Sequence, residues 1–142
     1  MSTQDCRKVA TALERLAAQG VAPRRIADAV VSTWQAVDVA LAPVIGGKGV
    51  EALYGRSLYL VREAHPWLAT LHREGRGVMD LAQLASTLEQ QDGFTAAAGA
   101  GDQLASVCEL LRSLIGISLT TQLLRSAWDN PFDGPTVLDR TP

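Results

Sequence analysis

Apolar residues recur at helical spacing along almost the whole chain, and this periodicity is the feature that most restricts the fold. The clearest run follows Pro23 and comprises Ile26, Val30, Thr33, Trp34, Val37 and Leu41. Intervals of three and four place such side chains on one face of an α-helix. No stretch shows sustained alternation of apolar and polar residues, which is the signal of a half-buried strand. We therefore expect an all-α protein.

Turn-forming residues divide this pattern into about six segments. The expected helices span roughly residues 3–19, 23–42, 50–64, 80–88, 96–115 and 118–128. The third is apolar on all sides at Leu58-Tyr59-Leu60-Val61, so we expect it at the centre of a bundle together with the fifth. A chain of 142 residues fits a single domain, here over 1–128. Three prolines and several turn formers predict a mobile, non-helical tail over 129–142.

Two stretches resemble each other, LAPVIGGKGVEALYGRSL from Leu41 and LRSLIGISLTTQLLRSAW from Leu111. Each ends a long helix at an Ile-Gly pair and then starts a shorter helix. With one gap, the Arg-Ser pairs at Arg56 and Arg125 also align. Two interpretations remain open, namely two copies of a three-helix unit or a chance similarity between amphipathic helices. In either case we expect Gly46 and Gly116 to be helix C-caps in the left-handed conformation, with positive φ, which glycine adopts without steric penalty.

The segment GGKG at 46–49 is the one stretch that suggests phosphate chemistry. A P-loop requires G-x-x-x-x-G-K followed by Ser or Thr, after a strand. The sequence fails this motif, because Ala42 stands where the first glycine is required and Gly49 where Ser or Thr is required. The expected element before it is also a helix and not a strand. A weaker anion site at the free backbone amides beside Lys48 is an alternative. We favour a simple helix junction, because the matching junction at Gly116 has no lysine.

No catalytic or metal-binding constellation is evident, so we expect no enzyme activity, no metal and no cofactor. The histidines His65 and His72 do not combine with Cys6 and Cys108 into a metal-ligand spacing. His65 precedes Pro66, which favours a structural role. An active site that assembles only in space remains an alternative. The net charge of −2 and 5% aromatic residues argue against a nucleic-acid partner.

The two cysteines lie far apart in the sequence at positions that appear apolar within helical patterns. We expect two reduced, buried thiols, with pairing only if the fold brings Cys6 and Cys108 together. The N-terminus lacks the apolar region of a secretory signal, and we expect no apolar run long enough to cross a bilayer. These features predict a cytoplasmic protein with no membrane partner. Richness in Ala, Arg and Gly is typical of bacteria with GC-rich genomes.

By elimination, the sequence favours a non-enzymatic protein-interaction or signalling and regulatory module of the bacterial cytoplasm, with a protein partner of unknown identity. The alternative is a helical sensor that binds a small ligand in an apolar pocket between helices. Its expected ligand-binding residues are Trp34, Tyr54, Arg56 and Arg125, with an arginine as the polar anchor. We also expect a homodimer, because Tyr59, Leu60 and the first helix offer more apolar surface than short helices readily bury.

Overall fold

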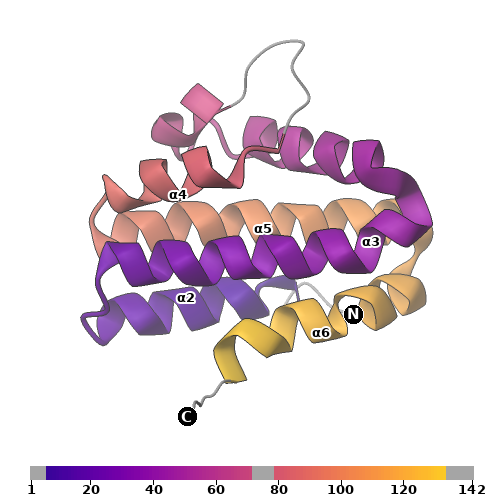
Figure 1. Cartoon of the computed structure of the whole chain (residues 1–142), viewed down its shortest axis with the longest axis horizontal. Coiled ribbons are helices and arrows are strands. Elements are labelled where there is room, and N and C mark those ends of the chain that lie inside the picture. The colour runs from indigo at the N-terminus through magenta and orange to yellow at the C-terminus, as the bar shows by residue number, and fades with distance from the viewer. Residues whose placement is uncertain (1–5, 72–78, 134–142) are drawn as a thin grey trace.

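The computed structural model describes residues 6–71 and 79–133, and these form an all-α bundle (Figure 1). Its elements are α2 (Lys8–Ala18), α3 (Pro23–Leu60), the 3₁₀ helix η1 (Pro66–Leu71), α4 (Leu81–Glu89), α5 (Gly93–Ile115) and α6 (Ile117–Asp133). The described residues contain no strand. The all-α prediction is confirmed. His72, by contrast, lies outside the described residues.

Glycines turn the chain sharply at two places. Within α3, Gly46 has φ 82° and ψ 159°, which separates a first arm (residues 23–45) from a second arm (residues 47–60). Gly116, with φ 90° and ψ 166°, separates α5 from α6. The predicted positive φ is confirmed at both glycines, but the predicted left-handed C-cap conformation is wrong at both. Their ψ is extended and not helical, so these residues form corners in a region that is essentially restricted to glycine.

Side-chain caps fix the start of two helices. The Asp80 carboxylate accepts a hydrogen bond from the Gln83 amide at 3.0 Å, which begins α4 where the sequence predicted. Asp92 accepts one from the Thr95 amide at 2.8 Å, so α5 begins at Gly93, ahead of the expected start near residue 96. Helix α6 extends to Asp133, and residues 129–133 of the predicted tail are therefore helical. Residues 134–142 lie outside the described part.

The two long helices share one framework. Residues 23–45 and α5 have the same length, 23 residues, and start 70 positions apart. Every buried side chain of the first arm has a buried counterpart 70 positions later. The pairs are Ile26 and Ala96, Ala27 and Ala97, Val30 and Ala100, Thr33 and Gln103, Trp34 and Leu104, Val37 and Val107, and Leu41 and Leu111. This correspondence, with both corners at the same offset, favours two copies of one unit over chance similarity.

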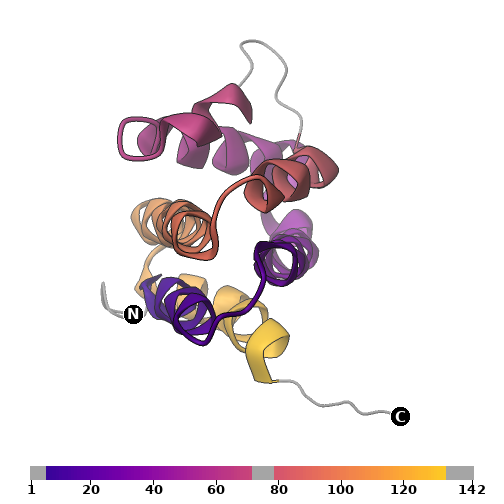
Figure 2. The same ribbon diagram turned by 90° about the vertical axis from the view of Figure 1, so that its left-hand side faces the viewer.

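In the two units, residues 8–60 and 81–133, the short helices pack mainly against the long helix of the other unit. α2 packs mainly against α5 of the second unit, and α4 packs mainly against α3 of the first. Likewise α6 packs more extensively against α3 than against its own neighbour α5. Figure 2, which looks along the bundle, shows α3 and α5 in the middle with a short helix beside each. One shared core therefore forms between the units.

The centre of that core is formed by α5 and the first arm of α3. Leu58 and Val61 are buried, whereas Tyr59 is 38% and Leu60 is 45% exposed. The prediction that the helix over 50–64 is central is thus wrong, because that helix lies at the outside with one face inward. The central position of α5 is confirmed, and α2 approaches it closely. A Cβ atom on Gly101 would lie 2.8 Å from Cα of Ala10.

Candidate functional site

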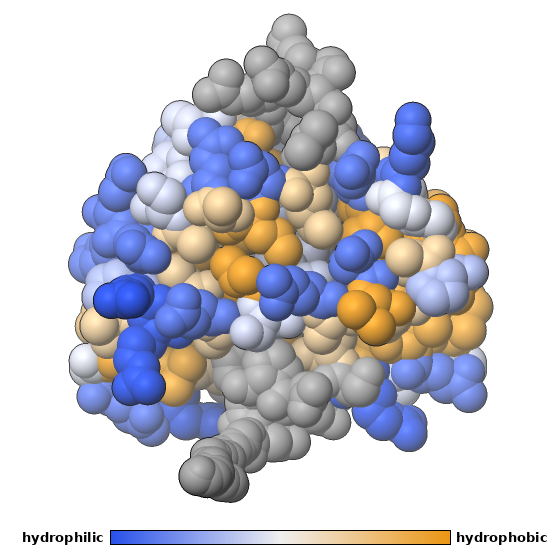
Figure 3. All heavy atoms as spheres, in the orientation of Figure 1, coloured by the Kyte–Doolittle hydropathy of each residue, from blue (hydrophilic) through white to orange (hydrophobic). Residues whose placement is uncertain are grey.

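Both glycine corners lie at the same end of the bundle, because the first arm of α3 and α5 run in the same direction (Figure 1). Four large apolar side chains are exposed next to these corners. They are Val44 (49% exposed), Leu114 (69%), Ile117 (50%) and Leu119 (38%), and we call them the apolar end. Figure 3 shows a broad hydrophobic area at this end. Val44 and Leu114 occupy equivalent positions of the two units, 70 residues apart.

The charged residues nearest to the two corners in sequence, Lys48 and Arg112, are positive, whereas Glu51 and Glu109 lie farther from the corners. Lys48 is exposed in the first turn after the Gly46 corner. The corner at Gly46 shows that GGKG contains a helix junction, and the preference for a junction over an anion site at Lys48 stays a prediction. The apolar end is thus a hydrophobic surface with positive charge beside it.

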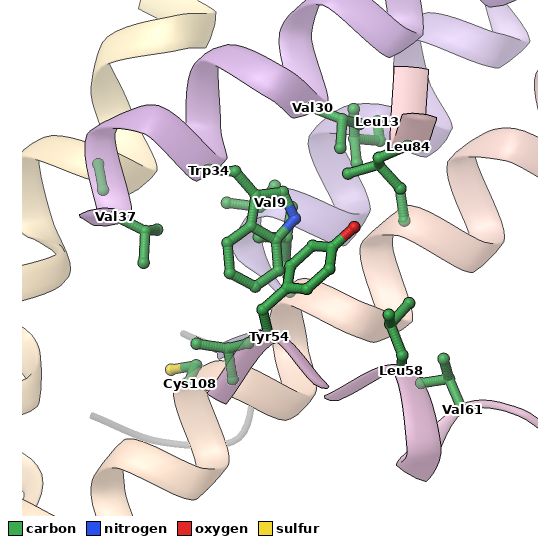
Figure 4. Packing of buried hydrophobic residues seen from close by; sticks show 14 of the residues in the cluster. Val9, Leu13, Val30, Trp34, Val37, Tyr54, Leu58, Val61, Leu84 and Cys108 are labelled. Carbon is green, nitrogen blue, oxygen red and sulfur yellow. The ribbon is translucent and has the colours of Figure 1, made fainter. Parts of the chain in front are cut away.

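The structure brings together two of the four residues predicted to bind a ligand. The rings of Trp34 and Tyr54 meet edge to face with centroids 4.9 Å apart. Trp34 is 0% and Tyr54 is 2% exposed, so the pair lies in the core (Figure 4). Neither the Trp34 Nε1–H nor the Tyr54 hydroxyl has a hydrogen-bond partner among the described residues. Burial, and secondly the Asp80 carboxylate, raise the pKa of Tyr54 well above its ordinary value.

The two arginines predicted as anchors lie elsewhere. The guanidinium of Arg56 lies over the ring of Tyr59 on the outer face of α3, with its Cζ 5.1 Å from the ring centroid. Arg125 is exposed on α6. The constant offset of 70 matches Arg125 with Gly55, so the two arginines are not equivalent positions of the repeat.

The predicted interface residues Tyr59 and Leu60 are partly exposed at the end of α3. Tyr59 is also covered by Arg62, whose Cζ lies 3.7 Å from the ring centroid and whose guanidinium donates to the Tyr59 carbonyl oxygen at 2.7 Å. The apolar face of α2, by contrast, is buried within the chain against α5. That helix therefore does not supply the surplus apolar surface on which the dimer expectation partly depended.

Cys6 and Cys108 form a disulfide that joins the chain just before α2 to the middle of α5. The prediction of two reduced thiols is therefore wrong. Its reasoning failed because α2 packs against α5, which brings together residues separated by 102 positions. Both cysteines are fully buried, as predicted. Structural disulfides are rare in reducing compartments, so the state of this pair in cells bears directly on the predicted cytoplasmic location.

Asp102 organises a polar cluster that the sequence analysis missed. Its carboxylate lies 2.8 Å from Nε2 of His65 and 3.0 Å from the guanidinium of Arg7. The cluster joins Arg7 at the start of α2 and His65 between α3 and η1 to Asp102 of α5. A structural role for His65 was predicted from Pro66, and this contact supports it. The signal for Asp102 was its position as the one acidic residue in the small-residue stretch 94–108.

Two further features bear on function. Within residues 6–71 and 79–133, no three His, Cys, Asp or Glu side chains come together as a candidate metal site. α3 is long and apolar enough to cross a membrane by length and composition. This is weak evidence, because a core helix of a soluble protein meets the same criterion. The inner face of α3 packs against α5 and α4.

In comparisons with known proteins, no family model matches the chain, and neither a curated protein nor a solved structure matches it.

Proposed function

We propose that this protein is a non-enzymatic interaction module that binds a partner protein through the apolar end. The observation that carries this proposal is the exposure of Val44 and Leu114 at equivalent positions of the two units. Exposed apolar residues scattered singly are common on protein surfaces. A cluster built from both units at one end of the bundle is different, and such patches typically mark binding surfaces.

The chemistry of the surface indicates the kind of partner. Lys48 and Arg112 carry positive charge beside the apolar residues and are the charged residues nearest to the corners in sequence, whereas Glu51 and Glu109 lie one turn farther along the helices. A complementary partner therefore presents apolar side chains flanked by Asp or Glu. An amphipathic helix with an acidic border has this pattern, and such helices bind apolar surfaces through residues spaced three and four apart. The proposed partner is therefore an amphipathic helix with an acidic border.

A direct test uses two synthetic amphipathic helices of about 18 residues, enough for five turns. Both carry the same leucine face, one flanked by Glu and the other by Lys. We expect the Glu-flanked peptide to bind more tightly in fluorescence anisotropy. Leu114→Ser should weaken binding by about 10- to 150-fold, since burying one leucine contributes about 1.5–3 kcal/mol. Phe94→Ser is the matched control, because Phe94 is 66% exposed at the opposite end of α5.

Three outcomes would contradict the proposal. Equal binding of both peptides would exclude charge complementarity. Light scattering that shows a dimer lost in Leu114→Ser would make a second copy of this chain the occupant. Binding to phosphatidylglycerol vesicles through Leu114, without peptide binding, would make the apolar end a membrane contact. The earlier predictions of a homodimer through Tyr59 and Leu60, and of a cytoplasmic location, stay predictions.

A further inference from the structure

The fully buried pair of Trp34 and Tyr54 leaves two hydrogen-bond donors unused in the core. Trp34 Nε1–H can only donate, and the Tyr54 hydroxyl has no partner of either kind among the described residues. In Figure 4 the indole nitrogen and the phenol oxygen point to the same side of the pair, toward Leu84 of α4. Buried polar groups are nearly always hydrogen-bonded, so two neighbouring exceptions require an explanation.

The repeat shows that the fold itself does not require these donors. The equivalent positions of the second unit hold Leu104 and Leu124, both fully buried. Two leucines thus occupy the matching places in the core with no polar atom to satisfy. The first unit has a polar pair where the second has an aliphatic one. This difference between the units leaves two donors without partners among the described residues in the core of the first unit, and packing alone does not explain why they are there.

We propose that Trp34 and Tyr54 form a binding site for a small, neutral, mainly apolar molecule that carries an acceptor oxygen. The oxygen of a ketone, ester, lactone or amide would accept from both donors. Its apolar part would lie against the aliphatic side chains around the pair, among them Leu84. This site is separate from the apolar end, because it lies in the core.

Charge excludes the anionic members of this class. None of the arginines predicted as anchors reaches the pair, since Arg56 lies over Tyr59 on the outer face and Arg125 is exposed. Burial, and secondly the Asp80 carboxylate, disfavour the phenolate form of Tyr54, so a negative charge acts on this pair. A carboxylate ligand would lie near a like charge in a place of low polarity. The site therefore fits a neutral acceptor.

α4 is the element that gives access. It is a helix of 9 residues held by two fully buried side chains, Leu84 and Leu88. It packs on α3 and hardly on α5. Elements with few buried contacts open locally at lower free energy than the core. Displacement of α4 would uncover the side toward which both donors point.

The test follows the indole N–H signal of Trp34 by ¹H–¹⁵N NMR, assigned from its loss in Trp34→Phe. The probes are cyclohexanone, methylcyclohexane and cyclohexanecarboxylate, which share size and differ in the acceptor. We expect a saturable downfield shift with cyclohexanone alone. Tyr54→Phe removes one donor with little change of shape and should weaken binding about two- to tenfold, the net value of one hydrogen bond. The indole signal of Trp67 is the internal control.

Each other outcome counts against the proposal. A shift of equal size with methylcyclohexane would show apolar binding without use of the donors. An unchanged affinity in Tyr54→Phe would exclude the hydroxyl. No shift up to the solubility of cyclohexanone, with a Trp34 N–H that exchanges magnetisation with water, would assign both donors to internal water and overturn the ligand site.

Discussion

Gly46 and Gly116 adopt nearly the same backbone conformation, with φ 82° and ψ 159° in one and φ 90° and ψ 166° in the other. Each ends a helix of 23 residues, and each is followed directly by a helix that turns back along the bundle. The two corners place Val44 and Leu114 at one end of the molecule. The proposed interaction surface therefore depends on the geometry of these two glycines.

Substitution of either corner glycine should destabilise the protein. A side chain at positive φ with extended ψ is strained, which costs of order 1–3 kcal/mol. We expect Gly46→Ala and Gly116→Ala to lower the free energy of unfolding by similar amounts in urea titrations. The two effects should be similar because neither new Cβ would meet another part of the described structure within 4 Å, which leaves backbone strain as the cause in both. Wild-type stability in either variant would show that its corner adopts another conformation.

Gly101 allows α2 and α5 to approach each other. A Cβ atom there would lie 2.8 Å from both Cα and Cβ of Ala10, so the backbone of α2 would have to move. Overpacking of this kind typically costs about 1–3 kcal/mol. We expect Gly101→Ala to lower the unfolding temperature, measured by circular dichroism.

Gly55→Ala is the matched control for that change. Gly55 lies in the second arm of α3, where no described atom would come within 4 Å of a new Cβ. Alanine is favoured over glycine in a helix interior by about 0.5–1 kcal/mol, so this variant should be more stable than wild type. Loss of stability in Gly55→Ala, or none in Gly101→Ala, would contradict the described packing.

The helices, their order and the two glycine corners could be predicted from sequence, because they depend on local spacing and on single residues. The packing of each short helix against the long helix of the other unit could not be predicted from the sequence. α2 is adjacent to α3 in the chain, yet it packs against α5, and no local pattern records that choice. The disulfide and the Asp102 cluster follow from this long-range contact, which is why neither could be predicted from the sequence.

The residues of the candidate sites also fall into those that could be predicted from the sequence and those that could not. Trp34 and Tyr54 were chosen as aromatic residues on apolar faces, and they do meet in the core. Arg56 and Arg125 were chosen from an alignment that needed a gap, and the structural offset of 70 has none. The apolar end was not predicted at all. It arises because two corners far apart in sequence lie at the same end of the bundle. They do so because the first arm of α3 and α5 run in the same direction, which no local sequence pattern specifies.

The disulfide should contribute strongly to stability. It closes a loop between residues 102 positions apart, and restriction of so long an unfolded loop is worth about 4–5 kcal/mol in the chain-entropy account. We expect the double variant Cys6→Ala with Cys108→Ala to lower the free energy of unfolding by about 2–5 kcal/mol. Non-reducing electrophoresis of protein trapped with iodoacetamide in intact cells would show the native state. A fully alkylated pair would support the cytoplasmic prediction and limit the disulfide to oxidising conditions.

The cap of α5 should make stability depend on pH. The Thr95 amide and hydroxyl donate hydrogen bonds to the Asp92 carboxylate at 2.8 Å and 3.0 Å. The hydrogen bond from the Thr95 backbone amide is the main reason that the pKa of Asp92 is lowered. A carboxyl group whose pKa is lower in the folded state binds its proton more readily when unfolded. Its stabilisation is therefore complete above the unfolded pKa of about 3.9 and is lost as the pH falls through the folded value.

We accordingly expect Asp92→Ala to be less stable than wild type at pH 6, with the difference shrinking below pH 4 (about the ordinary pKa of Asp). Urea titrations from pH 2.5 to 7 (a range of about one unit or more on each side of that pKa) measure it. Asp28→Ala, at an exposed carboxylate within α3, controls for the loss of one negative charge. The cap would be excluded as the cause if the difference between Asp92→Ala and wild type stayed constant across this range, or if Asp28→Ala reproduced it.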